Sequence, residues 1–316
     1  YEIAETFSLI AKYTTNPNIV DDDVATIVDD GTGKRFGPDM PGGTPQESTQ
    51  NLDDDRRLSI NSVRVNEGSP YAVFTVTGLS GQSMRLSLTN GSATIEDGSA
   101  PVKTDGSEDF GRGLQVWDPT SGTAGAWVDY TAGALVNIPG GATRLLVRTP
   151  ILADPLDEGD HTFTLTATPP AGLAATGTGT IDDHGGGSYF PNLPPGQNGT
   201  PATDPSVILD DDRPLTVNSL TLSESSPYVV FTVTGVVNQL VKLELESGTA
   251  TVGTDTGTAL QYFDGTTWRD YTPGSFVHIP PSGSTLLVRV ALVNDSTLEV
   301  SETFKLKASN LSLIHI

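Results

Sequence analysis

Residues 53–78 read DDDRRLSINSVRVNEGSPYAVFTVTG, and residues 210–235 read DDDRPLTVNSLTLSESSPYVVFTVTG. The two stretches align without a gap at an offset of 157 residues, and 17 of their 26 positions are identical. A repeat of this period is typical of chains built from tandem modules, each of which is one structural unit. The shared residues are strand formers and carboxylates rather than a catalytic constellation, which favours a structural over an enzymatic role.

Strand patterns continue outward from this repeat. Residues 71–76 and 228–233 are runs of aromatic and β-branched side chains, and each run is followed by a turn that contains a glycine. Residues 84–89 and 241–246 alternate apolar with polar side chains, which places one face of each strand in a core and the other in water. About seven short strands per module, separated by turn residues, predict an all-β chain of antiparallel β-sandwiches.

A second shared motif around a phenylalanine sets the module boundaries, because it occurs at residues 2–9, 158–165 and 299–306. It indicates that the chain is an internal fragment that opens near the end of one module. The stretches between modules are rich in Pro and Gly and are predicted to be extended linkers. The last six residues, LSLIHI, match the translation of a common sequencing-library adapter and are predicted to lie outside the fold. The predicted units are the end of a module at 1–30, a linker at 31–50, a complete module at 51–184, a linker at 185–206, a third module at 207–310, and the artefact at 311–316.

Acidic residues dominate the charge of the chain, with 39 Asp and Glu against 17 Lys and Arg and a formal net charge of −22. This balance argues against nucleic acid and anionic membranes as partners and favours solubility or bound cations. Cysteine is absent, so an exported chain of this kind would need metal ions rather than disulfides to stabilise its modules. Clusters of two or three aspartates flank both linkers and suggest charge-controlled joints between modules.

An ordered series of carboxylates runs through the complete module and recurs in the next. The series resembles that of Calx-beta-type modules, and of the related immunoglobulin-like repeats in giant repeats-in-toxin-type bacterial adhesins. The resemblance implies a β-sandwich that binds Ca²⁺ through acidic loops at one end, within an extended cell-surface protein. The residues it marks as metal ligands are Glu67, Asp109, Asp154, Asp157, Glu158, Asp182 and Asp183 in the complete module, and Glu224, Asp255, Asp295, Glu299 and Glu302 in the third.

The residue types fit calcium chemistry independently of the resemblance. Ca²⁺ takes 6–8 oxygen ligands, and carboxylates from separate loops supply both charge and denticity. Loops at one end of a sandwich converge even when they lie far apart in sequence, and a cation relieves the repulsion between clustered carboxylates. For any single residue, an acid that only solvates a turn is an equally good interpretation.

Two positions depart from the family pattern. An acid precedes the motif phenylalanine by two residues at Glu5 and Glu302, but the complete module has His161 there. Asp160 beside it is a possible substitute ligand. Leu298 stands where the complete module has Asp157, so the sites are expected to differ between modules.

Other site chemistries find little support. No zinc-ligand spacing, nucleophile elbow or phosphate-binding loop is present, and the histidines His161 and His278 are interpreted as strand residues and His184 as part of the linker. Trp127 and Trp268 occupy matching positions, where core packing is the simpler interpretation than a sugar-binding platform.

We therefore expect non-enzymatic, calcium-stabilised extender repeats of a large secreted bacterial surface protein that supports adhesion. Its expected partners are calcium ions, neighbouring modules and an unidentified cell-surface or matrix ligand, with no nucleic acid and no insertion into a membrane. Two alternatives remain open at this point: the modules bind a carbohydrate or protein ligand themselves, or they form the stalk of a secreted enzyme.

Overall fold

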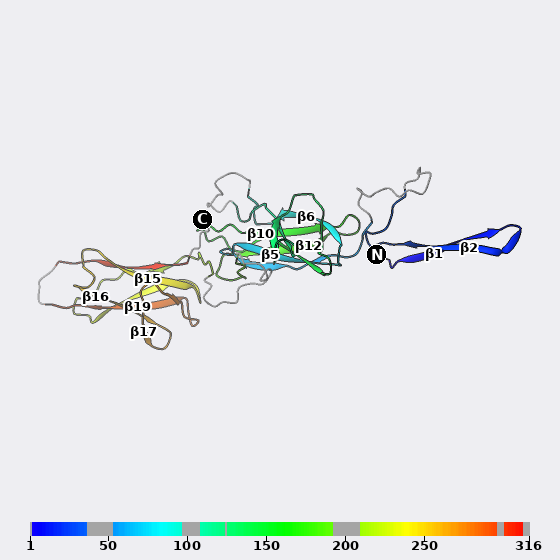
Figure 1. Cartoon of the computed structure of the whole chain (residues 1–316). Coiled ribbons are helices and arrows are strands. Elements are labelled where there is room, and N and C mark those ends of the chain that lie inside the picture. The colour runs from blue at the N-terminus through cyan, green and yellow to red at the C-terminus, as the bar shows by residue number, and fades with distance from the viewer. Residues whose placement is uncertain are drawn as a thin grey trace.

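The computed structural model describes residues 2–36, 53–96, 108–123, 125–191, 209–295 and 300–311. Within these ranges the chain is all-β, and the units follow one another along an elongated molecule: a long hairpin, a first sandwich and a second sandwich (Figure 1). No helix in the described ranges is long and apolar enough to cross a membrane. The fold is therefore the tandem β-sandwich that the strand patterns predict.

Two five-stranded sheets form the first sandwich. Most neighbouring strands are antiparallel, but β12 pairs with β4 in parallel. One sheet contains β3 (Ser59–Ile60), β5 (Tyr71–Thr77), β10 (Arg144–Pro150), β7 (Gln115–Asp118) and β8 (Ala126–Asp129), in that spatial order. The other contains β4 (Val63–Asn66), β12 (Ala175–Asp182), β11 (His161–Thr168), β6 (Ser83–Asn90) and β9 (Val136–Asn137).

The second sandwich repeats this plan with a smaller second sheet. Phe231 of β14 lies opposite Val288 of β19, as Phe74 lies opposite Val147 in the first sandwich. The larger sheet contains β13 (Thr216–Val217), β14 (Tyr228–Thr234), β19 (Thr285–Leu292), β16 (Thr256–Phe263) and β17 (Trp268–Asp270). The smaller contains β18 (Phe276–His278), β15 (Leu240–Ser247) and β20 (Phe304–Ser309).

The N-terminal hairpin of β1 (Glu5–Tyr13) and β2 (Asn16–Ile27) matches the β11–β12 hairpin in register. Glu5 lies opposite Ile27 just as His161 lies opposite Ile181. In β11 the phenylalanine of the motif, Phe163, is fully buried, whereas Phe7 in β1 is 57% exposed. The hairpin therefore has the strand pairing of the repeat without the covering sheet.

Three phenylalanines from different strands and loops form the centre of the first core. The rings of Phe110 and Phe163 are stacked with centroids 4.3 Å apart, and Phe74 meets Phe163 edge to face at 5.8 Å. Gly179 of β12 lies across the Phe163 ring, where an added Cβ would come within 2.5 Å of it. The second core keeps only the edge-to-face pair, Phe231 with Phe304 at 5.9 Å.

Three sequence predictions need correction. Residue 311 was predicted to lie outside the fold, but Leu311 is buried and forms a backbone bridge to Asp211. The described part of the first sandwich has ten strands rather than about seven, because edge strands of two residues such as β3 carry no alternating pattern that could be read from sequence. The predicted linker beginning at 185 also starts too early. Ser188 bridges to Val65 of β4, and Phe190 is buried in the core of the first sandwich. The folded unit therefore extends at least to Phe190.

The paired tryptophans lie beside an arginine in both sandwiches, which is buried in the first and partly buried in the second. Trp127 packs against the core, and Arg148 lies over its ring at 4.4 Å and over that of Tyr71 at 3.7 Å. Arg289 makes the same contacts with Trp268 and Tyr228. Cation–π stacking of this kind is a structural use of tryptophan, in keeping with the simpler of the two interpretations.

Candidate metal centre

The carboxylates of the first sandwich meet at one end because each follows a strand that ends there. Glu67 follows β4, Asp154 follows β10, and Asp182 and Asp183 lie at the end of β12. Asp109 precedes Phe110, which bridges to Ile151 just beyond β10. These five residues are between 2% and 8% exposed. Carboxylates are seldom buried to this extent unless they are paired or bind a metal.

Backbone amides fix the orientation of three of these side chains. The Asp154 amide donates to Glu67 Oε1 at 3.1 Å, the Glu158 amide to Asp183 Oδ2 at 2.7 Å, and the Thr94 amide to Asp109 Oδ2 at 2.6 Å. The second oxygens of Glu67 and Asp183, Oε2 and Oδ1, are buried with no hydrogen-bond donor among the described residues. The loops thus hold each carboxylate by one oxygen and leave the other for a ligand.

The electrostatics of the cluster oppose full ionisation in the absence of a cation. Burial, together with the nearby carboxyl of Asp183, raises the pKa of Glu67 to about 10. Burial also raises the pKa of Asp183. Burial and the charges of Asp154 and Asp109 raise the pKa of Glu158. A divalent cation would remove this repulsion and keep the carboxylates ionised.

His161 belongs to the cluster, in place of the acid that the family pattern has there. It is the first residue of β11, as the strand interpretation has it, and its Nδ1 lies 2.5 Å from Asp109 Oδ1 and 3.8 Å from Glu158 Oε2. Burial of the ring works against protonation, but the hydrogen bond to Asp109 outweighs it and raises the pKa of His161. Asp109, Glu158 and His161 bring one ligand atom each within 4.8 Å of one another.

Two predicted ligands have other partners in the structure. Asp182 Oδ2 lies 2.7 Å from an Arg64 guanidinium nitrogen, and Asp160, the suggested substitute ligand, pairs with the same arginine. Asp157 is partly exposed and bonds the ring of His184 at 2.9 Å. Asp157 and Asp160 therefore lie at the rim rather than in the buried cluster.

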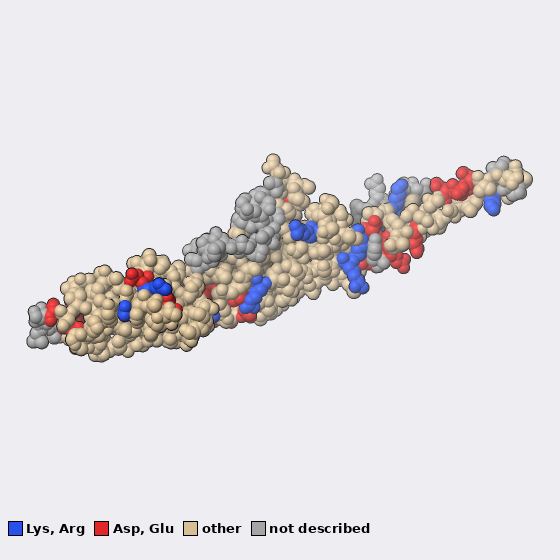
Figure 2. Space-filling view, turned by 90° about the horizontal axis from the view of Figure 1, so that it is seen from below, with Lys and Arg blue, Asp and Glu red and all other residues tan. Residues whose placement is uncertain are grey.

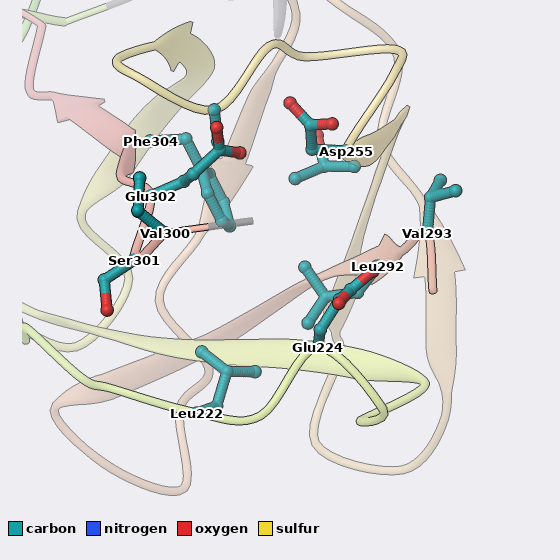
Figure 3. A pocket seen from close by; sticks show the side chains of 11 residues that line it. Leu222, Glu224, Asp255, Leu292, Val293, Val300, Ser301, Glu302 and Phe304 are labelled. Carbon is teal, nitrogen blue, oxygen red and sulfur yellow. The ribbon is translucent and has the colours of Figure 1, made fainter. Parts of the chain in front are cut away.

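The second sandwich, which is the predicted third module, repeats part of the site. The Asp295 amide donates to Glu224 Oε1 at 3.0 Å and the Thr251 amide to Asp255 Oδ2 at 2.6 Å, which are the counterparts of the bonds to Glu67 and Asp109. Glu224, Asp255 and Glu302 line a pocket of about 280 Å³. Figure 3 shows Asp255 and Glu302 turned toward each other across its upper rim. Glu299 lies outside the described residues.

Two carboxylates that the ligand prediction did not include complete the cluster of the first sandwich. Asp210 and Asp212, which begin the following module, are 0% and 5% exposed. Their oxygens lie within 4.8 Å of each other and of a Glu67 oxygen. The signal was present in the sequence as the repeated aspartate triplet, but its position after a linker gave no indication that it folds back.

The donor set of the cluster suits a hard cation. Carboxylate oxygens from five separate segments meet at this end of the sandwich, and Ca²⁺ prefers such a set. Softer metals favour imidazole and thiolate ligands, and here the single imidazole is bonded to a carboxylate. The arrangement of the described residues therefore fits a site for a divalent cation with oxygen ligands.

Comparison with known proteins finds low-scoring similarity to solved structures. No protein-family model matches the chain, and no curated protein matches it. Among solved structures, the calcium-binding domain pair CBD12 of CALX1.1 has a TM-score of 0.29 and 14% identity, covering 80% of each chain. CBD12 of CALX1.2 has a TM-score of 0.28 and 14% identity, covering 79% of this chain and 78% of that one. The class 5 fimbrial chaperone CfaA has a TM-score of 0.21 and 10% identity, covering 79% and 99%.

Proposed function

We propose that the first sandwich binds Ca²⁺ at its carboxylate cluster and that the bound ion stabilises the module. The observation that carries this proposal is the pair of orphaned oxygens, Glu67 Oε2 and Asp183 Oδ1, in buried side chains tied down by backbone amides. An unsatisfied buried carboxylate oxygen costs free energy unless a ligand meets it. Calcium meets this need, because its coordination tolerates several carboxylates in irregular geometry.

At the level of the whole chain, we propose calcium-stabilised extender repeats of a secreted bacterial surface protein that supports adhesion. Three features support this role: the modules repeat in tandem, they lie end to end in an elongated molecule (Figure 1), and cysteine is absent. A ligand at 100-fold excess over its dissociation constant contributes about 2.7 kcal/mol to stability. Millimolar extracellular calcium would thereby replace disulfides. The repetition of the cluster favours such a non-enzymatic role over a unique active site.

Calorimetric unfolding of the full chain tests the calcium proposal. With millimolar Ca²⁺ in place of EDTA, the transition of the first sandwich is expected to rise by roughly 10 °C, from the stabilisation above and the usual dependence of melting temperature on free energy. Mg²⁺ at the same concentration is expected to have a much smaller effect, because it needs closer octahedral geometry.

Variants separate binding from general charge effects. Asp154→Asn is expected to remove most of the calcium shift, whereas the control Asp21→Asn/Asp22→Asn lowers the acidity of the exposed strand β2 and leaves the shift intact. The proposal fails if the transition of the unmodified chain is the same in calcium and in EDTA.

A further inference from the structure

The aspartate triplet at the start of the third module docks on the end of the first sandwich. The Asp210 amide donates to Asn66 Oδ1 at 2.7 Å, and Asn66 Nδ2 donates back to the Asp210 carbonyl at 3.0 Å. Asn66 is the last residue of β4, directly before Glu67. This two-way bond fixes the backbone of the following module beside the carboxylate cluster, and Asp210 is fully buried there.

The middle aspartate of the triplet has a different role from its neighbours. Asp211 forms backbone bridges to His184 on one side and to Leu311 on the other, and its side chain is held by Arg213, with Nε 2.7 Å from Oδ1. In an extended segment, residues i and i+2 point to the same side. Asp210 and Asp212 therefore face the cluster together, and their oxygens lie within 4.8 Å of Glu67.

We propose that a divalent cation bound at Glu67 also takes Asp210 and Asp212 as ligands, and so locks one module to the next. This inference rests on the proposed calcium site of the first sandwich and adds a second module to its ligands. The independent sign of a ligand is again Glu67 Oε2, which is buried with no hydrogen-bond partner among the described residues. The Glu67 side chain has an oxygen within 4.8 Å of oxygens of Asp210 and Asp212. Three carboxylates held this close repel one another until a cation binds between them.

The same docking geometry occurs at the preceding joint. Asp54 bridges to Asp30 as Asp211 bridges to His184, and Arg56 holds the Asp54 side chain with Nε 2.7 Å from Oδ1. Gly31 and Gly185 both have φ of +75°, and an added Cβ would lie 3.0 Å from Asp54 Cβ and 2.9 Å from Asp211 Oδ2. Figure 2 shows acidic and basic surface gathered where the hairpin meets the first sandwich. The joint is thus a repeated structural unit rather than a free linker.

A locked joint has a mechanical consequence. Without the cation, Asp210 and Asp212 bring negative charge against a buried carboxylate, which favours separation of the modules. With the cation, the same charges become attractive contacts. Calcium would therefore set the stiffness of the array, and the joint would be the charge-controlled element that the flanking aspartates suggest.

Distance measurements across the joint test this inference in the full chain. The sequence contains no cysteine, so Ser87→Cys in β6 and Thr285→Cys in β19 place one spin label in each sandwich, both at exposed positions. Pulsed electron paramagnetic resonance is expected to give a narrow distance distribution in calcium and one at least twice as wide in EDTA.

The deciding variant is Asp210→Asn/Asp212→Asn, which keeps the backbone bonds to Asn66 and removes two charges. At saturating calcium this variant is expected to keep a wide distribution of distances between the two spin labels, and its calcium affinity is expected to be at least tenfold lower. In the control Asp21→Asn/Asp22→Asn, calcium is expected to narrow the distance distribution as in the parent chain. Circular dichroism verifies that both variants fold.

The outcomes separate the two proposals. Suppose that calcium raises the melting temperature but does not narrow the distance distribution of the parent chain, or narrows that of the double variant equally. The proposal that the cation links the two modules is then wrong, and the proposed calcium site in the first sandwich stands. If titration calorimetry detects no calcium binding at all, both proposals fail.

Discussion

The chain carries two copies of one carboxylate cluster, and they differ in how completely they are enclosed. Both copies tie a glutamate to the amide of a downstream aspartate, Glu67 to Asp154 and Glu224 to Asp295. In the first sandwich Glu67 is buried beneath Asp183 and the triplet of the next module, whereas Glu224 is exposed. The first sandwich therefore builds part of its site from its own loops and last strand, and the aspartate triplet of the following module supplies the rest.

A second difference between the two sandwiches lies directly behind the cluster. Phe110, next to Asp109, is stacked on Phe163, whereas the residue after Asp255 is the buried Thr256. Phe110→Ala removes a ring from a closed core and is expected to destabilise the first sandwich by about 3–5 kcal/mol. Chemical denaturation of the full chain, monitored separately for each sandwich, measures this loss.

Thr256→Ala is the matched control for that substitution. It deletes a small side chain and is expected to cost the second sandwich about 1 kcal/mol. Equal losses from the two substitutions would show that the aromatic stack does not support the end of the sandwich that carries the cluster.

Substitution of the equivalent glutamates Glu67 and Glu224 tests whether burial of the site determines how much the glutamate contributes to stability. In calcium, Glu67→Gln is expected to destabilise the first sandwich by about 2–3 kcal/mol, because the ion loses a buried ligand. Glu224→Gln at the exposed copy is expected to change the second sandwich by no more than about 0.5 kcal/mol. Calorimetric scans in calcium measure both effects.

In EDTA the change in stability caused by Glu67→Gln is expected to have the opposite sign from that in calcium. Glu67→Gln is expected to stabilise the metal-free first sandwich, because folding then no longer requires protonation of a buried carboxylate whose pKa is raised. If Glu224→Gln costs as much in calcium as Glu67→Gln, the enclosed and open sites do not differ in the way the burial of their side chains indicates.

The sandwich modules were easier to predict from the sequence than the joint between them. The repeat at 53–78 and 210–235, with its period-two strands, was sufficient to predict tandem sandwiches, because alternation reports directly on burial. It also placed Glu67, Asp109 and Asp154 in loops that the structure brings to one end of the sandwich. Asp182 shows the limit of such reasoning, since its pairing with Arg64 depends on the register of β12 on β4.

The joint was harder to predict because its contacts cross a linker. Nothing local in Asp210 or Asp212 distinguishes a buried ligand from a solvated turn. The buried position arises from the backbone bond of Asp210 to Asn66, 144 residues away. The repetition of Asp-Asp-Asp-Arg at 53–56 and 210–213 was the available clue. Its arginine pairs with the middle aspartate in both copies.

A further expected effect is the response of the metal-free cluster to pH. Because burial and Asp183 raise the pKa of Glu67 above its value in the unfolded chain, its ionisation costs stability as pH rises above that unfolded value. The raised pKa of His161, which its bond to Asp109 maintains against burial, contributes stability that is lost as pH rises through that pKa. Both groups thus predict that, in EDTA, the first sandwich gains stability between pH 7.5 and pH 6.

For one proton this gain is at most about 1.4 kcal/mol per pH unit. Saturating calcium should reduce or reverse it, because a bound cation favours the ionised carboxylates and acidification would displace the ion. Parallel calorimetric scans at the two pH values, with and without calcium, measure the difference, and Glu67→Gln should remove most of the gain in EDTA. A first sandwich that loses stability over this range in EDTA would mean that its carboxylates are compensated without a metal, and the enclosed copy would then be no more of a cation site than the open one.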